Sequence, residues 1–147
     1  MRKVLVIHGP NLNLLGRREP EVYGRMTLDD VNAAILGKAR ELGMEVEIRQ
    51  SNHEGEIIDW LHGAEAEGFE GVVLNPGGLT HYSVSLRDAI AAIGIPVVEV
   101  HLTNIHAREE MRRRTVTGEA CWGVISGFGH LSYLLALEAL RQREGGG

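Results

Sequence analysis

The sequence predicts an α/β protein built on a doubly wound parallel sheet of five strands with helices on both faces. Two observations support this prediction. Short apolar runs alternate with segments of helical period along the whole chain, which is typical of a parallel sheet joined by crossover helices. One of the runs, GVVLN at 71–75, is almost continuously apolar, as expected for a strand that helices cover on both faces.

The first three elements have clear local signals. KVLVI at 3–7 is short and rich in branched residues, and Gly9-Pro10 follows it as a stop signal. Thr27 and Asp30 form an acidic variant of the capping box, so they predict a helix from Leu28 onward, and Gly43 supplies its C-cap. MEVEIRQ at 44–50 alternates in polarity, as a half-exposed strand does.

The remaining elements continue the alternation. A helix is expected over 55–68, because Ile57, Leu61 and Ala64 share one face and a glycine ends the segment. The strand GVVLN and four further elements complete the series: a helix at 84–94, strands at 96–100 and 123–126, and a closing helix at 131–141. Five such strands most often adopt the flavodoxin-like order 2-1-3-4-5. We expect one domain over 1–147, with 144–147 as a frayed tail.

Composition narrows the classes of function. The chain has 147 residues and a formal net charge of -5, so nothing biases it toward nucleic acid or an anionic membrane. No apolar run approaches the roughly 20 residues of a membrane span, and a cytoplasmic protein is expected. Cys121 is the single cysteine; it excludes an internal disulfide and is interpreted as a small buried side chain. The histidines lack carboxylates at fixed spacing, so no metal site is expected.

Polar residues gather in the loops that follow strands 1, 3 and 4. These strands are neighbours in the predicted order, so the three loops should meet in one crevice at the carboxyl edge of the sheet. The crevice is expected to hold Asn11, Arg18, Tyr23, Asn75, His81, His101, Thr103 and Arg112. Each also has a structural interpretation: the asparagines suit turns, Arg112 to Arg114 suit a solvated charged surface, and isolated histidines are usually structural.

Amides, hydroxyls, imidazoles and guanidinium groups together favour a small polyhydroxylated anion as ligand. A nucleotide is disfavoured because the chain has neither a Walker loop nor a G-x-G-x-x-G motif. Few aromatic residues are available to sandwich a flavin. Lys3 and Lys38 are the only lysines; one starts the first strand and the other lies in a helix, so Schiff-base catalysis is disfavoured.

Three motifs carry a resemblance to a known family. GPNLNLLGRREPEVYG, NPGGLTHYSVSLRDAI and EVHLTNIHAREEMRR closely resemble the type II 3-dehydroquinate dehydratases, in register from about Val4 to Leu140. The resemblance implies a cofactor-independent anti elimination of water from 3-dehydroquinate to 3-dehydroshikimate through an enolate, a step of the shikimate pathway. It also implies a homododecamer built from trimers.

The resemblance assigns a role to each matching residue. Tyr23 would be the base that removes the proton beside the ketone, and Arg18 would lower the pKa of that tyrosine. Asn11 would hold a water on the enolate oxygen. His101 would protonate the departing hydroxyl, oriented by Glu99. The family's substrate-binding positions match Asn75, His81, Asp88, Leu102, Thr103 and Arg112.

Elementary chemistry agrees with these roles. A guanidinium near a phenol can lower the phenol pKa by roughly one to three units. Glu99 and His101 are two residues apart at a strand end, so they start on one face of the sheet and can form a hydrogen bond that keeps the histidine protonated. The segment GRREPEVYGRMT at 16–27 is interpreted as a lid hinged near Gly16 and Gly24. On the residues alone, Arg17 or Arg25 could tune the tyrosine instead; only the resemblance favours Arg18.

The chain also departs from the family pattern. Thr103 stands where serine is common, RRTVTGEACWG lacks the family's tyrosine and Ser-Pro, and GFGHLSY differs before the last helix. These departures leave the expected catalytic residues intact but bear on the expected subunit contacts. The alternative from another class is a non-catalytic flavodoxin-like module that binds a small polyhydroxy carboxylate.

Overall fold

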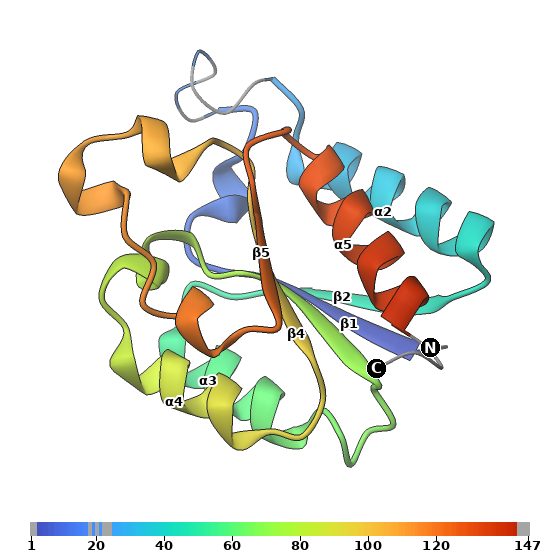
Figure 1. Cartoon of the computed structure of the whole chain (residues 1–147). Helices are drawn as coiled ribbons and strands as arrows, with labels where there is room; N and C mark the ends of the chain where they lie inside the picture. Colours follow the sequence, from blue (N-terminus) through green and yellow to red (C-terminus); the bar gives the residue numbers. More distant parts are fainter. Residues whose placement is uncertain (1–2, 18, 20, 22–24, 144–147) are drawn as a thin grey trace.

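A five-stranded parallel sheet forms the centre of the computed structural model, which describes residues 3–17, 19, 21 and 25–143. The strand order is β2-β1-β3-β4-β5 and every neighbouring pair is parallel (Figure 1). The strands are β1 (Lys3–His8), β2 (Glu45–Gln50), β3 (Gly71–Asn75), β4 (Val97–His101) and β5 (Gly123–Ser126). The predicted fold class and strand order are confirmed. The expected tail at 144–147 lies outside the described residues.

Helices cover both faces of the sheet (Figure 1). Helices α2 (Leu28–Leu42) and α5 (Leu131–Arg143) share one apolar cluster with Val4 and Val6. Helices α3 (Glu54–Gly63) and α4 (Val84–Ala92) share the other cluster with Leu5 and Ile7. Successive residues of β1 thus point to opposite layers, as the period of a strand requires. Because side chains alternate between the two faces along a strand, the position of His8 in β1 and of His101 in β4 decides which helical layer each histidine enters.

The helix ends follow from local sequence. Thr27 caps α2 through a capping box in which its hydroxyl accepts from the Asp30 amide and the Asp30 carboxylate accepts from the Thr27 amide, and Gly43 ends the helix at φ 69°. The helix expected over 55–68 differs, because the regular helix α3 stops at Gly63. Tighter turns continue to Gly68, at φ 90°, where the Phe69 amide bonds the Ala64 carbonyl at 3.1 Å. That closure is the Schellman pattern that glycine favours.

Short 3-10 turns carry the connections at the carboxyl edge of the sheet. They are η1 (Leu12–Leu14), η2 (Gly77–His81), η3 (Ile105–Ala107), η4 (Glu110–Arg112) and η5 (Gly118–Ala120). Three of them, η1, η2 and η3, directly follow β1, β3 and β4. Within the described ranges, no helix is long and apolar enough to cross a membrane.

Candidate active site

A cavity of about 190 Å³ opens where the loops after β1, β3 and β4 meet. This is the edge at which doubly wound sheets bind ligands, and the predicted convergence of the three polar loops is confirmed. Seven of the residues proposed from the sequence line the cavity: Asn11, Asn75, His81, His101, Leu102, Thr103 and Arg112. Arg108 and Ile105 also line it and were not singled out from the sequence.

The other proposed residues lie elsewhere. Glu99 is fully buried behind His101 rather than at the cavity wall. Asp88 is exposed on α4, its carboxylate 3.8 Å from Arg87, and it does not line the cavity. Arg18 and Tyr23, together with the proposed hinge at Gly24, lie outside the described residues. The roles that the resemblance gives to these side chains stay predictions.

Glu99 and His101 form the predicted carboxylate–imidazole pair. His101 Nε2 lies 2.7 Å from Glu99 Oε2, and both side chains are buried. A carboxylate accepts only, so the proton of this bond belongs to Nε2. The bond leaves His101 Nδ1 as the ring nitrogen available to a ligand, and His101 lines the cavity. The arrangement can deliver a proton to a bound molecule.

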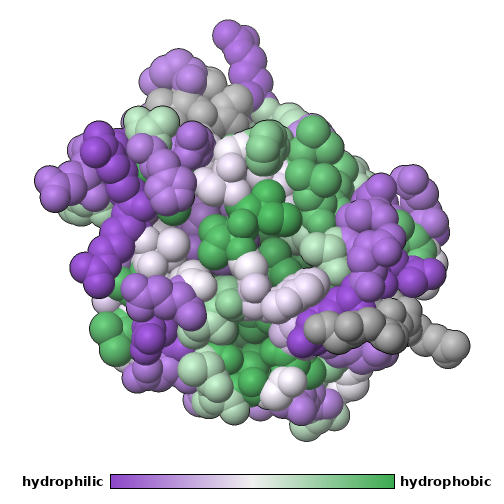
Figure 2. Space-filling model, in the orientation of Figure 1, coloured by the Kyte–Doolittle hydropathy of each residue, from purple (hydrophilic) through white to green (hydrophobic). Residues whose placement is uncertain are grey.

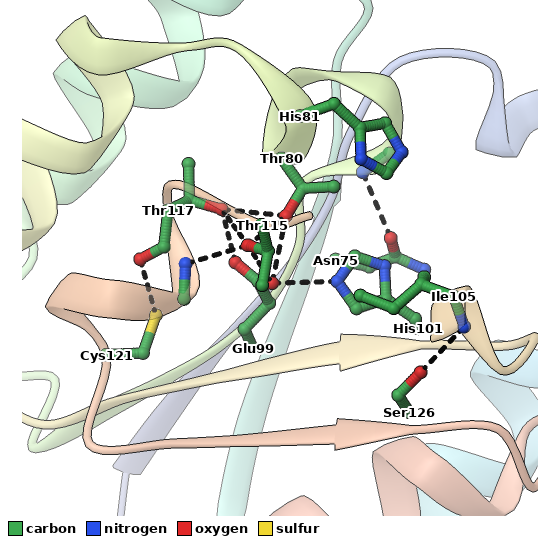
Figure 3. A network of polar contacts seen from close by, with 12 residues as sticks. Asn75, Thr80, His81, Glu99, His101, Ile105, Thr115, Thr117, Cys121 and Ser126 are labelled. Carbon is green, nitrogen blue, oxygen red and sulfur yellow. Dashed lines mark hydrogen bonds and ion pairs between the residues drawn. The ribbon is translucent and has the colours of Figure 1, made fainter. Parts of the chain in front are cut away.

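Glu99 has a pKa below its ordinary value although it is buried. Burial alone would raise the pKa; the hydrogen bond and charge of His101 and the hydroxyls of Thr117 and Thr115 more than offset that effect. The carboxylate is therefore held in its ionised form. Figure 3 shows these groups side by side, with hydroxyls on one side of Glu99 and the imidazole on the other.

Asn75 is held by a chain of hydrogen bonds that runs into the core. Its Oδ1 accepts from the Gly77 amide at 3.1 Å, and its Nδ2 donates to the Tyr133 hydroxyl at 3.0 Å. Tyr133 Oη lies 2.8 Å from His8 Nδ1, and His8 Nε2 lies 2.7 Å from Asn32 Oδ1. An amide oxygen only accepts, so Nε2 of His8 carries the proton and Tyr133 donates to Nδ1. The Asn75 amide orientation is thereby fixed, with one N–H left for a ligand.

The two titratable members of this chain are neutral. Burial lowers the pKa of His8 to about 4, a shift that its bond to Asn32 only partly opposes. Burial also raises the pKa of the Tyr133 phenol, and the hydrogen bond from Asn75 opposes that shift in part. Neither His8 nor Tyr133 was proposed from the sequence. A lone tyrosine on the apolar face of the last helix was the available signal, since buried tyrosine hydroxyls usually have a partner.

His81 and the two arginines complete the polar wall. The Arg114 carbonyl lies 2.7 Å from His81 Nδ1, so that nitrogen donates and Nε2 is left as an acceptor. Arg112 pairs with the Glu109 carboxylate, and Arg108 Nη1 lies 3.4 Å from Thr103 Oγ1. Two guanidinium groups at one wall favour an anionic ligand. Arg108 had no distinctive sequence signal beyond its place in the polar loop after β4.

Backbone packing sets the floor of the cavity. Gly9 lies so close to the loop after β3 that an added Cβ would meet the Asn75 and Pro76 carbonyl oxygens at 2.8 Å. Gly77, at φ 58°, would place a Cβ 2.9 Å from the Pro10 carbonyl oxygen. Asn11 adopts the left-handed conformation at φ 71°, which asparagine tolerates better than most residues. The loops after β1 and β3 therefore interlock directly beneath Asn11 and Asn75.

Among the described side chains, no group of three or more His, Cys, Asp or Glu residues is placed to hold a metal ion. The groups that line the cavity are instead hydrogen-bond donors and acceptors suited to a polar organic anion. Together the fold and the site define a class: a doubly wound α/β protein with a carboxylate-bound histidine at the wall of a small polar ligand cavity.

Comparison with known proteins identifies the family. The sequence model of the family described as dehydroquinase class II matches residues 2–141, and the chain belongs to that family. A 3-dehydroquinate dehydratase of Thermus thermophilus is 60% identical over 139 residues, which cover 95% of this chain and 93% of the relative. The resemblance noted from the three sequence motifs is confirmed.

Solved structures agree with this result. The type II dehydroquinase of Butyrivibrio crossotus superimposes with a TM-score of 0.93 at 44% identity, covering 95% of this chain and 97% of the other. That of Propionibacterium acnes gives a TM-score of 0.92 at 42% identity, covering 97% of both chains. The similarity thus extends over nearly the whole sheet and its helices.

Proposed function

We propose that the protein is a hydro-lyase that converts 3-dehydroquinate to 3-dehydroshikimate by anti elimination of water through an enolate, without a cofactor. Family membership supports the reaction, and one geometric observation carries its assignment to this cavity. The buried Glu99 carboxylate binds His101 Nε2 at 2.7 Å while His101 lines the cavity. Hydroxide is a poor leaving group, so the elimination needs such an acid.

His101 acts as that acid. Glu99 favours the imidazolium form, and Nδ1 gives its proton to the departing hydroxyl so that the group leaves as water. Because Glu99 keeps its bond to Nε2, the ring stays oriented throughout. A positioned general acid contributes about 10²–10⁴-fold in rate.

Tyr23 acts as the base, with Arg18 as its charge partner. An unperturbed tyrosine has a pKa of about 10, so a phenolate at neutral pH requires a nearby cation. Asn11, at the cavity wall, holds a water that hydrogen-bonds the enolate oxygen. The 16–27 segment acts as a lid whose closure brings the base to the substrate and excludes water.

The substrate is bound by the remaining wall. Asn75 offers its free N–H to a substrate oxygen, and His81 offers an acceptor nitrogen to a substrate hydroxyl. Leu102 and Thr103 lie beside them in the loop after β4, and Arg112 supplies the positive charge that a carboxylate or hydroxyl oxygen seeks. Their place at the wall of the cavity supports these roles.

We further propose a homododecamer of trimers in the cytoplasm, in which Asp88 contacts substrate in a neighbouring copy. Asp88 is exposed and outside the cavity of its own chain, which supports that arrangement. Apolar side chains are exposed on the face that carries β5 and α5, including Val124, Phe128 and Leu131 (Figure 2). Light scattering of the purified protein tests the assembly; a monomer would contradict it and leave Asp88 without a role at the site.

The activity test follows the ultraviolet absorbance of the conjugated enone after 3-dehydroquinate is added to the purified protein. The proposal expects absorbance to rise, and no rise at any pH from about 6 to 9 would overturn it. Tyr23→Phe and Arg18→Ala should each remove most of kcat. A Tyr23→Phe variant with wild-type kcat would exclude tyrosine as the base. Arg17→Ala, at an exposed position, is the matched control for Arg18.

A further inference from the structure

The segment RRTVTGEACWG, which departs from the family pattern, supplies two residues to the interior of the site. Thr115 and Thr117 lie just before η5, with Thr117 as its N-cap, and Thr80 comes from η2. Their hydroxyls surround the Glu99 carboxylate on the side opposite His101 (Figure 3). We call Thr80, Thr115 and Thr117 the threonine cage.

Each cage hydroxyl contacts a carboxylate oxygen. Thr80 Oγ1 lies 2.9 Å and Thr115 Oγ1 2.8 Å from Glu99 Oε2, and Thr117 Oγ1 donates to Glu99 Oε1. His101 Nε2 donates to Oε2 at 2.7 Å. Thr80, Thr117 and Glu99 are fully buried, so water does not replace these bonds.

The donors around Glu99 favour its ionised form. His101 Nε2 and the hydroxyls of Thr80 and Thr115 lie within hydrogen-bond distance of Oε2, and the hydroxyl of Thr117 donates to Oε1; an ionised carboxylate can accept from all sides, because both of its oxygens are acceptors only. If the Nε2 proton moved to Glu99, the number of hydrogens would stay the same, but the cage hydroxyls would lose a charged acceptor. A buried carboxylate without such donors would instead be driven toward its neutral form.

We propose that Thr80, Thr115 and Thr117 are positioning residues that keep Glu99 an anion and thereby keep His101 an imidazolium whose Nδ1 proton points into the cavity. The inference rests on the proposed function, because it explains how the acid of that reaction stays charged in a buried site. It makes the 115–117 segment part of the proton-delivery apparatus.

Without the cage, the imidazolium proton would pass from Nε2 to Glu99. The product is a neutral pair in which His101 keeps a proton only on Nδ1, where it is too weakly acidic to release a hydroxyl group as water. The transfer moves one proton within the pair and leaves its net charge unchanged. Its free-energy cost falls as each hydroxyl is removed, because a hydrogen bond to a charged acceptor is stronger than one to a neutral acceptor.

On the cavity side of the pair, the ionisable side chains of His81, Arg108 and Arg112 line the cavity together with His101. Cys121 lies nearby, and its Sγ donates to the Thr117 carbonyl at 3.5 Å. Burial, and then the charge of Glu99, raise the pKa of its thiol, so it is neutral at ordinary pH. Arg114, whose carbonyl holds His81, has an exposed side chain. Among the described side chains, His101 and the three cage threonines are the ones that bond the Glu99 carboxylate directly.

A purely structural cage would have a different signature. Thr115 Oγ1 also accepts from the Gly118 amide at 2.9 Å, so the hydroxyls could serve only to hold η5 in place. In that case their loss would lower stability without changing the protonation of His101. The two interpretations are separated by reading the histidine directly.

The test uses Thr80→Val, Thr115→Val and Thr117→Val, which keep the side-chain shape and remove the hydroxyl, with the matching serine variants. Nitrogen NMR of the His101 ring at pH 7 reports imidazolium or neutral imidazole. We expect wild type to show imidazolium and the Thr117→Val ring to shift toward neutral, with kcat lower by roughly 10- to 100-fold. Serine at the same position should restore both readings. Ser83→Ala, which removes the hydroxyl that caps α4, should change neither.

Wild-type His101 signals and kcat within about twofold of wild type in all folded valine variants would overturn the proposal. So would equal losses in the valine and serine variants with unchanged ring signals, because that result indicates structure alone. Should Thr117→Val fail to fold, Thr115→Val, at the least buried cage position, gives the same reading. The NMR result does not depend on turnover. If the wild-type protein has no dehydratase activity but the His101 ring signal still shifts toward neutral imidazole in Thr117→Val, the cage is supported and the dehydratase function is refuted.

Discussion

His8 and His101 occupy equivalent places in the sheet and have opposite electrostatics. Each is the last residue of its strand, β1 or β4, and each is buried. His8 enters the layer of α2 and α5, where it bonds a neutral amide and a neutral phenol. His101 lies on the side of Glu99 and bonds a carboxylate. The position in the fold does not decide what a buried histidine does; its partner does.

The two histidines therefore serve different purposes: His8 holds a binding residue in place, whereas His101 is placed to react with the ligand. The hydrogen-bond partners of His8 carry no charge that compensates an imidazolium, so burial dominates and lowers the pKa to about 4. Its chain through Tyr133 ends on Asn75, so a neutral histidine fixes a ligand-facing amide. The buried partner of His101 is instead an ionised carboxylate, which bonds Nε2 and leaves Nδ1 on the cavity side.

Replacing each histidine by alanine should give the largest difference between the two sites. His101→Ala should lower kcat for water loss by about 10²–10⁴-fold, while exchange of the proton beside the ketone falls much less. His8→Ala should instead lower the free energy of unfolding, because Tyr133 and Asn32 lose buried partners at about 1–3 kcal/mol each. Enone formation, deuterium exchange and urea unfolding measure the three quantities. Equal losses of exchange and water loss in His101→Ala would remove its assignment as the acid.

The pH dependence of stability sharpens the contrast. The pKa of His8 is about 4 in the folded protein against an ordinary 6.5, so the unfolded chain binds the proton first as pH falls. The contribution of His8 to the free energy of unfolding is therefore complete above pH 6.5, and it falls by about 3 kcal/mol between pH 6.5 and pH 4. Glu99, whose pKa is lowered, contributes its own loss only below its ordinary pKa of 4.5. Urea unfolding at pH 7, 6, 5 and 4.5 isolates the His8 slope, and His8→Gln should flatten it.

Asn32→Asp should make His8 resemble His101. A carboxylate in place of the amide oxygen 2.7 Å from Nε2 favours the imidazolium and should raise the pKa of His8 by roughly one to three units. The stability loss between pH 6.5 and 4.5 should shrink accordingly. Proton NMR titration of the ring measures the shift. An unchanged His8 pKa would show that burial, and not the partner, controls this site.

Tyr133→Phe is expected to have the smallest effect. It leaves the buried ring in place but removes the hydroxyl that accepts from Asn75 and donates to His8. Unfolding should cost about 1–3 kcal/mol less, and KM should rise more than kcat falls, because Asn75 loses its fixed orientation. Leu137→Ala, on the same helix and fully buried, is the control: it should lower stability without the rise in KM.

Much of this arrangement could be predicted from the sequence. Strand and helix alternation indicated the sheet order, and residues that follow β1, β3 and β4 were expected together because parallel strands end at one edge. The Glu99–His101 bond followed from the period of a strand. These features depend on neighbours in the chain or on topology alone.

Other features depend on packing between distant segments. Thr80 and Thr117 meet only because η2 and η5 fold over the same strand, and no local pattern marks a threonine as a carboxylate donor. The first strand was expected to end at Ile7, with His8 opening the polar loop, and nothing in the local sequence marked His8 as a buried partner of Tyr133. The end of α3 was misplaced because tight turns and a helix share the same apolar spacing up to Gly68.

The close packing of the loops after β1 and β3 restricts which residues positions 9 and 77 can hold. A Cβ at Gly9 or Gly77 would collide with backbone of the opposite loop at 2.8 or 2.9 Å, whereas one at Gly78 meets nothing within 4 Å. Because the colliding atoms belong to the backbone, no second substitution in the opposite loop can make room for a side chain at either glycine. In a library of all single substitutions, positions 9 and 77 should therefore be empty of survivors, while alanine at 78 persists. Sequence change at the ligand site would then be confined to its side chains, because the two glycines that let the loops pack together cannot be replaced.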